Sequence, residues 1–145
     1  MRLARVRWRQ AVEQVSHQRL LFIDESGAKT NMTRLYGRGP RGARVVDHVP
    51  SSRWKTTTMI AVMGRHGAQA AWVLDGPMDG AAFAVWAEHI LPPTLAHGDI
   101  VVMDNLSVHK NQSARAAIEA AGAMVWDLPP YSPDFNPIEK MWSKI

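Results

Sequence analysis

The 145-residue sequence contains no cysteine. Disulfide bonds, cysteine-ligated zinc and thiol catalysis are therefore excluded. No apolar run approaches the ~20 residues that a membrane-spanning helix needs. The first ten residues, MRLARVRWRQ, are rich in arginine but lack the apolar stretch of a secretory signal. We therefore expect a cytoplasmic protein with no membrane partner.

The composition is that of one globular domain. Hydrophobic residues make up 46% of the chain. A chain of this length buries roughly 70% of the surface that it exposes when unfolded, which is enough for a core without covalent cross-links.

Charge is distributed unevenly along the chain. Residues 1–55 hold 12 of the 17 Lys/Arg and 4 of the 13 Asp/Glu, a net charge of +8, whereas residues 56–145 carry a net charge of −4. This asymmetry favours a basic surface for a polyanion beside an acidic half with another role. A solvated basic face explains the charge equally well.

Apolar runs and helical spacing predict strands and helices that alternate in the second half of the chain. Residues 1–19 read as a basic, partly helical lead-in. Five strands are predicted within 20–24, 56–64, 68–76, 99–105 and 123–128, the second and third forming a hairpin through GRHG. Helices are predicted within 78–95, with Asp79 as N-cap, within 111–122, and after Pro137. This order predicts a mixed α/β sheet with an antiparallel hairpin edge and helices on both faces.

Two of the predicted strands end in an aspartate, Asp24 in LLFID and Asp104 in DIVVMDN. In α/β sheets, chemistry gathers beyond the carboxyl ends of the strands. If the two strands are parallel neighbours, their tips lie about 5 Å apart. Both carboxylates then reach one cation, with oxygen ligands at roughly 2.1 Å as magnesium requires. Two carboxylates this close repel each other without a cation or a raised pKa.

A stiff loop with four prolines, LPPYSPDFNPIEKMW (128–142), leads into the last predicted helix. Asn136 suits the N-cap and Pro137 the first helical position. Glu139 then either bonds back to the helix start, as in a capping box, or faces the two aspartates. Taken with Asp24 and Asp104, the rigid loop favours Glu139 as a third carboxylate of the same site.

The segments FIDES, VVMDNLSVHK and LPPYSPDFNPIEKMW resemble the three signature blocks of the mariner-related bacterial insertion-sequence transposases (the insertion sequence six-thirty family). TNMTRLYGRGPRG, after the first block, also resembles bacterial members. Between Asp104 and Glu139 lie 34 residues, which matches the aspartate-to-glutamate spacing of that superfamily. The resemblance covers residues 20–145.

The resemblance implies an RNase H-like fold and a DDE endonuclease that cleaves and joins DNA at transposon ends. By position, Asp24, Asp104 and Glu139 become the catalytic and metal-binding triad. The implied cofactor is Mg²⁺, with Mn²⁺ as a substitute, and two ions about 4 Å apart would bracket the scissile phosphate. Double-stranded DNA is the implied partner.

Several residues near the three carboxylates are weaker candidates for a role at the site. Glu25 alternates to the face opposite Asp24 and is expected to be an outer hydrogen-bonding residue. His109 either makes a local hydrogen bond or touches a phosphate or a metal-ligand side chain. Asn105 either assists the site or makes an Asx turn. Asp127 reads as a turn residue or a fourth ligand. Tyr131 and Phe135 pack under the loop or touch DNA.

A basic, glycine-rich segment is expected to contact the DNA backbone without reading its bases. The alternative for this segment is a solvated loop. The expected phosphate contacts are Arg34, Arg38, Arg41, Arg44, Arg53, Lys55 and Lys110.

The sequence departs from the family pattern at both ends. Residues 1–19 are too short for a helix-turn-helix region, and the chain stops six residues past Glu139. We therefore expect a catalytic half, truncated at its last helix, that works as a homodimer or with a companion DNA-binding polypeptide. Two rival interpretations are a catalytically silent DNA-binding remnant and an RNase H-like nuclease that acts on RNA–DNA hybrids.

Overall fold

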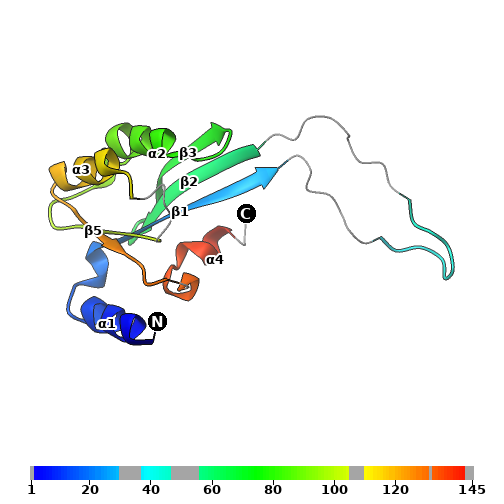
Figure 1. Ribbon diagram of the computed structural model, residues 1–145, viewed down its shortest axis with the longest axis horizontal. Coiled ribbons are helices and arrows are strands. Elements are labelled where there is room, and N and C mark those ends of the chain that lie inside the picture. Colours follow the sequence, from blue (N-terminus) through cyan, green and yellow to red (C-terminus); the bar gives the residue numbers. More distant parts are fainter. Residues whose placement is uncertain (1, 30–36, 47–55, 105–109, 131, 143–145) are drawn as a thin grey trace.

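The computed structural model describes residues 2–29, 37–46, 56–104, 110–130 and 132–142. Its centre is a five-stranded sheet in the order β3-β2-β1-β4-β5 (Figure 1). The strands are β1 (Leu20–Lys29), β2 (Thr56–Gly64), β3 (Gly67–Asp75), β4 (Ile100–Met103) and β5 (Met124–Asp127). β1, β4 and β5 pair in parallel, whereas β2 pairs antiparallel with both β1 and β3. The predicted mixed sheet with a hairpin edge is therefore confirmed.

One face of the sheet is covered by helices from the middle of the chain. These are α2 (Gly80–Val85), continued by the π-helical turn η2 (Trp86–Ile90), and α3 (Gln112–Ala120). Asp79 caps α2 as predicted, because its carboxylate accepts a hydrogen bond from the Ala82 N–H at 2.8 Å. The core on this face contains Leu21, Ile23, Phe83, Trp86, Val101, Met103 and Ile118.

The other face is covered by the two ends of the chain (Figure 1). α1 (Arg2–Glu13) packs Trp8 and Val12 against a second apolar cluster built on Leu20, Ile100, Val102 and Leu128. The 3₁₀ turn η5 (Pro133–Phe135) follows the proline-rich loop and leads into α4 (Ile138–Trp142), which packs against β1. The predicted helices on both faces are therefore confirmed.

β1 is longer than predicted. The parallel pairing with β4 is recorded as far as Phe22, but the antiparallel pairing with β2 continues to Lys29, opposite Thr56. Asp24 therefore lies inside a strand, and the prediction that this strand ends at Asp24 is wrong. The physical reason is that β2 supplies backbone partners to residues whose own sequence, SGAK, has little strand preference.

No helix in the described ranges has the length and apolar character needed to cross a membrane.

Candidate functional site

The register of the parallel strands β1 and β4 places Asp24 and Asp104 side by side. Leu20 pairs with Ile100, and Phe22 pairs with Val102. Continuing this register by two residues sets Asp24 beside Asp104, which directly follows β4. Neighbouring strands lie about 4.8 Å apart. β1 and β4 are therefore parallel neighbours, which is the condition under which the two aspartates meet.

Both aspartates belong to the face of the sheet that carries the two chain ends. Side chains alternate along a strand, so residues 20, 22 and 24 share one face. Leu20 and Phe22 contact the second apolar cluster, together with Ile100 and Val102 of β4. Asp24 is 6% exposed, so its carboxylate lies in the interior of this face, which α1 and α4 also cover.

Asn136 fixes the start of α4 against β1. Its amide nitrogen donates to the carbonyl oxygen of Ile23 at 3.4 Å, one residue before Asp24. Its amide oxygen accepts from the N–H of Ile138 at 3.2 Å, which supplies the predicted cap of the helix. Asn136 is 3% exposed, and Ile138 is fully buried. The loop therefore delivers α4, and with it the backbone of Glu139, to the strand that carries Asp24.

The chemistry of this site is that of adjacent carboxylates in a partly desolvated setting. Like charges this close favour a cation between them, and carboxylate oxygens are the ligands that magnesium and manganese prefer. The described side chains contain no group of three potential metal ligands. The side chain of Glu139 lies outside what the structure describes.

The remaining predicted site residues are distributed as follows. Glu25 pairs with Ile60, whose side chain belongs to the core under α2 and α3, so Glu25 faces away from Asp24. Asp127 accepts a hydrogen bond from Arg115 of α3 at 2.6 Å. Asn105, His109 and Tyr131 lie outside the described residues.

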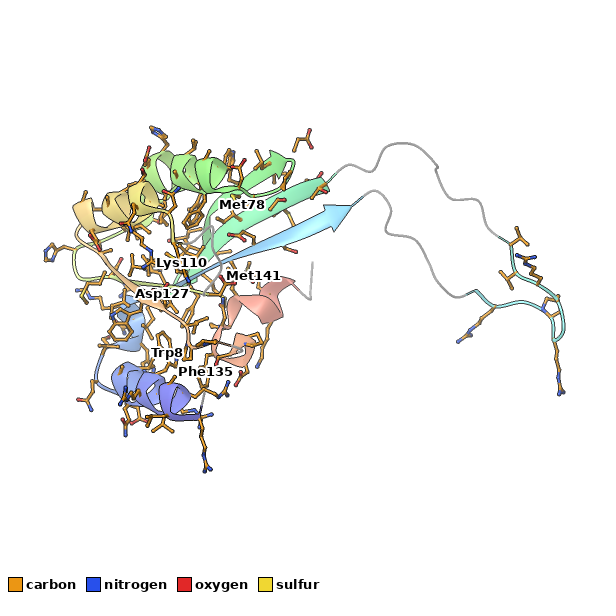
Figure 2. All side chains as sticks on the ribbon, viewed as in Figure 1. Trp8, Met78, Lys110, Asp127, Phe135 and Met141 are labelled. Atoms are coloured by element: carbon orange, nitrogen blue, oxygen red, sulfur yellow. The ribbon has the colours of Figure 1, made fainter. Side chains whose placement is uncertain are left out.

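Four of the expected phosphate contacts are described, and all are exposed. Arg38, Arg41 and Arg44 belong to residues 37–46, which lie beyond the ends of β1 and β2 in Figure 1. Lys110 lies on the body of the domain, shortly before α3 (Figure 2). Arg34, Arg53 and Lys55 lie outside the described residues.

Two features beside the site were missed by sequence reasoning. The hydrogen bond from Asn136 to β1 adds an anchoring role to its capping role. Arg5 of α1 forms an ion pair with Asp134 of the proline-rich loop at 2.7 Å. Neither pattern is local, because these partners lie more than a hundred residues apart in the sequence.

Comparison with known proteins adds a family and a fold. The family model for DDE superfamily endonucleases matches residues 19–145. Among solved structures, a Mos1 transposase paired-end complex with the left transposon end is 17% identical, with a TM-score of 0.67 over 97% of this chain and 45% of that chain. The mariner Mos1 paired-end complex with Mg is 18% identical, with a TM-score of 0.67 over 97% of this chain and 46% of the other.

The isolated catalytic domain of the Mos1 mariner transposase gives a TM-score of 0.58 at 16% identity, over 97% of this chain and 65% of that one. These likenesses confirm the RNase H-like fold. The chain spans about half the length of the transposase chains in these two paired-end complexes. No curated protein matches the sequence.

Proposed function

The chain belongs to the DDE superfamily endonucleases, and we propose that residues 20–145 form the catalytic half of a metal-dependent DNA transposase. We further propose that it is of the mariner-related bacterial insertion-sequence type, on the strength of FIDES, VVMDNLSVHK and LPPYSPDFNPIEKMW. The observation that carries the proposal is the β1–β4 register, which sets Asp24 beside Asp104. Asp24 belongs to β1, the strand against which Asn136 holds α4.

The residues at this site fit a divalent cation. Asp24 and Asp104 offer carboxylate oxygens from adjacent strands, and a cation beside them would favour the ionised form of both carboxyl groups, one of which, Asp24, is buried. α4, which packs against β1, carries Glu139. We propose these three residues as the ligands of Mg²⁺ or Mn²⁺. Solved Mos1 complexes with Mg and with Mn support this choice of ions.

In this proposal the side chains of the protein hold and orient the metal ions, and the ions, when bound, would supply the electrophilic chemistry. Bound there, such ions would supply activation of the attacking oxygen and stabilisation of the leaving oxygen in an in-line displacement at phosphorus. Asp24 and Asp104 fix the site on the rigid centre of the sheet, and α4 completes it with Glu139. Attack by water cleaves the transposon end, and attack by a DNA 3′-hydroxyl joins it to a target.

The substrate proposed is double-stranded DNA, consistent with the transposon-end DNA in the Mos1 complexes. Arg38, Arg41 and Arg44 are proposed to neutralise backbone phosphates from an exposed segment. Lys110 is proposed as a further phosphate contact nearer the site. Assembly as a homodimer, or with a companion DNA-binding polypeptide, is part of the same proposal.

The experiment is nicking of supercoiled plasmid with Mg²⁺ or Mn²⁺ by the wild type and by Glu139→Gln. The matched control is Glu119→Gln, the same change at an exposed glutamate on α3, across the sheet. We expect nicking by the wild type and the control only with metal, and none by folded Glu139→Gln. Full activity of Glu139→Gln would leave Glu139 as a capping residue only.

Two further outcomes separate the rival functions. A wild type that is folded and binds DNA but never nicks it would point to a DNA-binding remnant. Preferential cleavage of RNA–DNA hybrids over duplex DNA would point to a ribonuclease H-like hydrolase.

A further inference from the structure

Arg5 of α1 makes several simultaneous contacts with the loop that precedes α4. Its Nη1 donates to Ser132 Oγ at 2.9 Å and to Asp134 Oδ1 at 3.0 Å, and its Nη2 donates to Asp134 Oδ2 at 2.7 Å. Its guanidinium carbon lies 4.3 Å from the centroid of the Phe135 ring. We call Arg5, Ser132, Asp134 and Phe135 the Arg5 cluster. A two-pronged guanidinium–carboxylate pair fixes orientation as well as distance.

The helix that carries Arg5 is itself docked by apolar contacts. Trp8, one turn further along α1, meets Trp126 of β5 edge to face, with ring centroids 5.8 Å apart. Trp8 of α1 and Phe135, in the segment before α4, both pack against the second apolar cluster (Figure 2). Arg5 is therefore presented to the loop from an element that is anchored on the sheet.

Only a few residues separate the part of the loop that Arg5 contacts from the start of α4, and hydrogen bonds within the loop connect the two. Ser132 is 4% exposed, and its carbonyl oxygen accepts from the N–H of Phe135 at 3.1 Å. The N–H of Asn136 donates to the carbonyl oxygen of Pro133 at 3.0 Å. Asp134 thus sits inside one tight turn that ends at Asn136. Arg5 holds this turn on the α1 side, and Asn136 holds it on the β1 side.

We propose that Arg5 is a positioning residue for the third carboxylate: by holding the turn that contains Asp134, it sets where α4 presents Glu139 to Asp24 and Asp104. This inference rests on the proposed function of Glu139. It assigns to α1, outside the three signature segments, a part in assembling the metal site.

The electrostatics agree with this geometry. Hydrogen bonding from Arg5 lowers the pKa of Asp134 below its ordinary value. The carboxylate is therefore ionised at neutral pH, where the two-pronged contact needs it.

The test compares Arg5→Gln, Arg5→Lys, Asp134→Asn and the double variant Arg5→Gln/Asp134→Asn with the wild type. Arg5→Lys keeps the charge and the apolar stem but loses the planar guanidinium. This variant replaces Arg5→Gln in the test if Arg5→Gln does not fold. The matched control is Arg7→Gln, which removes an exposed arginine from the same helix. Binding of Mn²⁺ without DNA is measured by the loss of the free-ion electron paramagnetic resonance signal. Hydrogen exchange is followed in residues 132–142 and, for comparison, in β2 and β3.

We expect Arg5→Gln to weaken Mn²⁺ binding roughly 3- to 10-fold and to lower plasmid nicking at saturating DNA by about 10- to 100-fold, the range expected for a misplaced catalytic group. Exchange should accelerate in residues 132–142 and stay unchanged in β2 and β3. Arg5→Lys should fall between Arg5→Gln and the wild type, and Arg7→Gln should bind Mn²⁺ as the wild type does. The double variant should be no worse than the single ones, because both remove one contact.

The inference and the proposed function fail in different ways. If the wild type nicks DNA and Glu139→Gln does not, but Arg5→Gln matches the wild type in Mn²⁺ binding and nicking, Arg5 has no positioning role. Accelerated exchange in β2 and β3 as well would reduce Arg5 to a general stabilising residue and overturn the inference. A wild type that neither binds Mn²⁺ nor nicks DNA overturns both.

Discussion

The side-chain amide of Asn136 joins the start of α4 to the carbonyl oxygen of Ile23 at 3.4 Å, next to Asp24. The same side chain caps α4 through the N–H of Ile138. One buried residue therefore both starts the helix and sets its position relative to the central strand. α4 has only five residues, and helices of that length depend on such contacts rather than on intrinsic helix preference.

Asn136→Ala should lower the free energy of unfolding by about 1–3 kcal/mol, because it leaves buried backbone groups without a partner. It should also abolish most metal-dependent nicking. Asn111→Ala is the matched control, since Asn111 caps α3 through Ala114 N and bonds Gly80 O. Urea unfolding should show a similar loss of stability in both variants, with nicking retained in Asn111→Ala. Equal nicking by the two variants would contradict an anchoring role for Asn136.

Metal should stabilise the folded protein through the two adjacent aspartates. A ligand at about 100 times its dissociation constant adds about 2.7 kcal/mol to the free energy of unfolding. We expect millimolar Mn²⁺ to raise the melting temperature of the wild type but not that of Asp24→Asn or Asp104→Asn. Asp75→Asn, which changes an exposed aspartate at the end of β3, should respond as the wild type does. An equal shift in Asp24→Asn would place the stabilising ion elsewhere.

The central sheet was predictable because its signals are local. Buried apolar runs such as IVVM and the capping aspartate Asp79 specify elements within a few residues, and their alternation implies parallel pairing. The extension of β1 beyond Asp24 was not predictable, since the residues of β2 that pair with it lie 27 to 35 positions further along the chain. The docking of α1 depends on Trp8 meeting Trp126 and Arg5 meeting Asp134, contacts between opposite ends of the sequence.

The three candidate carboxylates were identified from strand ends, a stiff loop and a family resemblance. The register of β1 and β4 adds that Asp24 and Asp104 share one face of the sheet. The contacts that hold α4 in place could not be predicted from the sequence. Asn136 bonds to Ile23 and Arg5 to Asp134, and only folding brings these partners close together.

DNA binding should depend on salt through the exposed arginines of residues 37–46. Each phosphate contact contributes about 0.9 to the slope of log K against log salt concentration. Changing Arg38, Arg41 and Arg44 together to glutamine should make that slope shallower by about 2.7, as measured by fluorescence anisotropy with a labelled duplex. Arg65→Gln, at an exposed arginine in the β2–β3 turn, is the control and should leave the slope unchanged. An unaltered slope in the triple variant would identify 37–46 as a solvated loop.

Stability should depend on pH through Asp134. Arg5 lowers the pKa of this carboxyl in the folded state, so its contribution is complete above the unfolded-state pKa of about 3.9 and is lost as pH falls through the lower folded-state value. The wild type should therefore be more stable than Asp134→Asn at pH 7, and the difference should shrink below about pH 4. Urea unfolding at several pH values measures it. A difference that is constant down to pH 3 would show that the Arg5 contact does not depend on an ionised Asp134.

The central claim is that Asp24, Asp104 and Glu139 share a divalent cation. Anomalous diffraction from crystals of the protein soaked in Mn²⁺ tests it most directly, because the ion is located independently of activity. The account predicts an anomalous peak between the Asp24 and Asp104 carboxylates, with oxygen ligands at roughly 2.1–2.2 Å and Glu139 among them or facing them. A peak elsewhere, or Glu139 turned back to the backbone at Asn136 with Mn²⁺ bound, would contradict it.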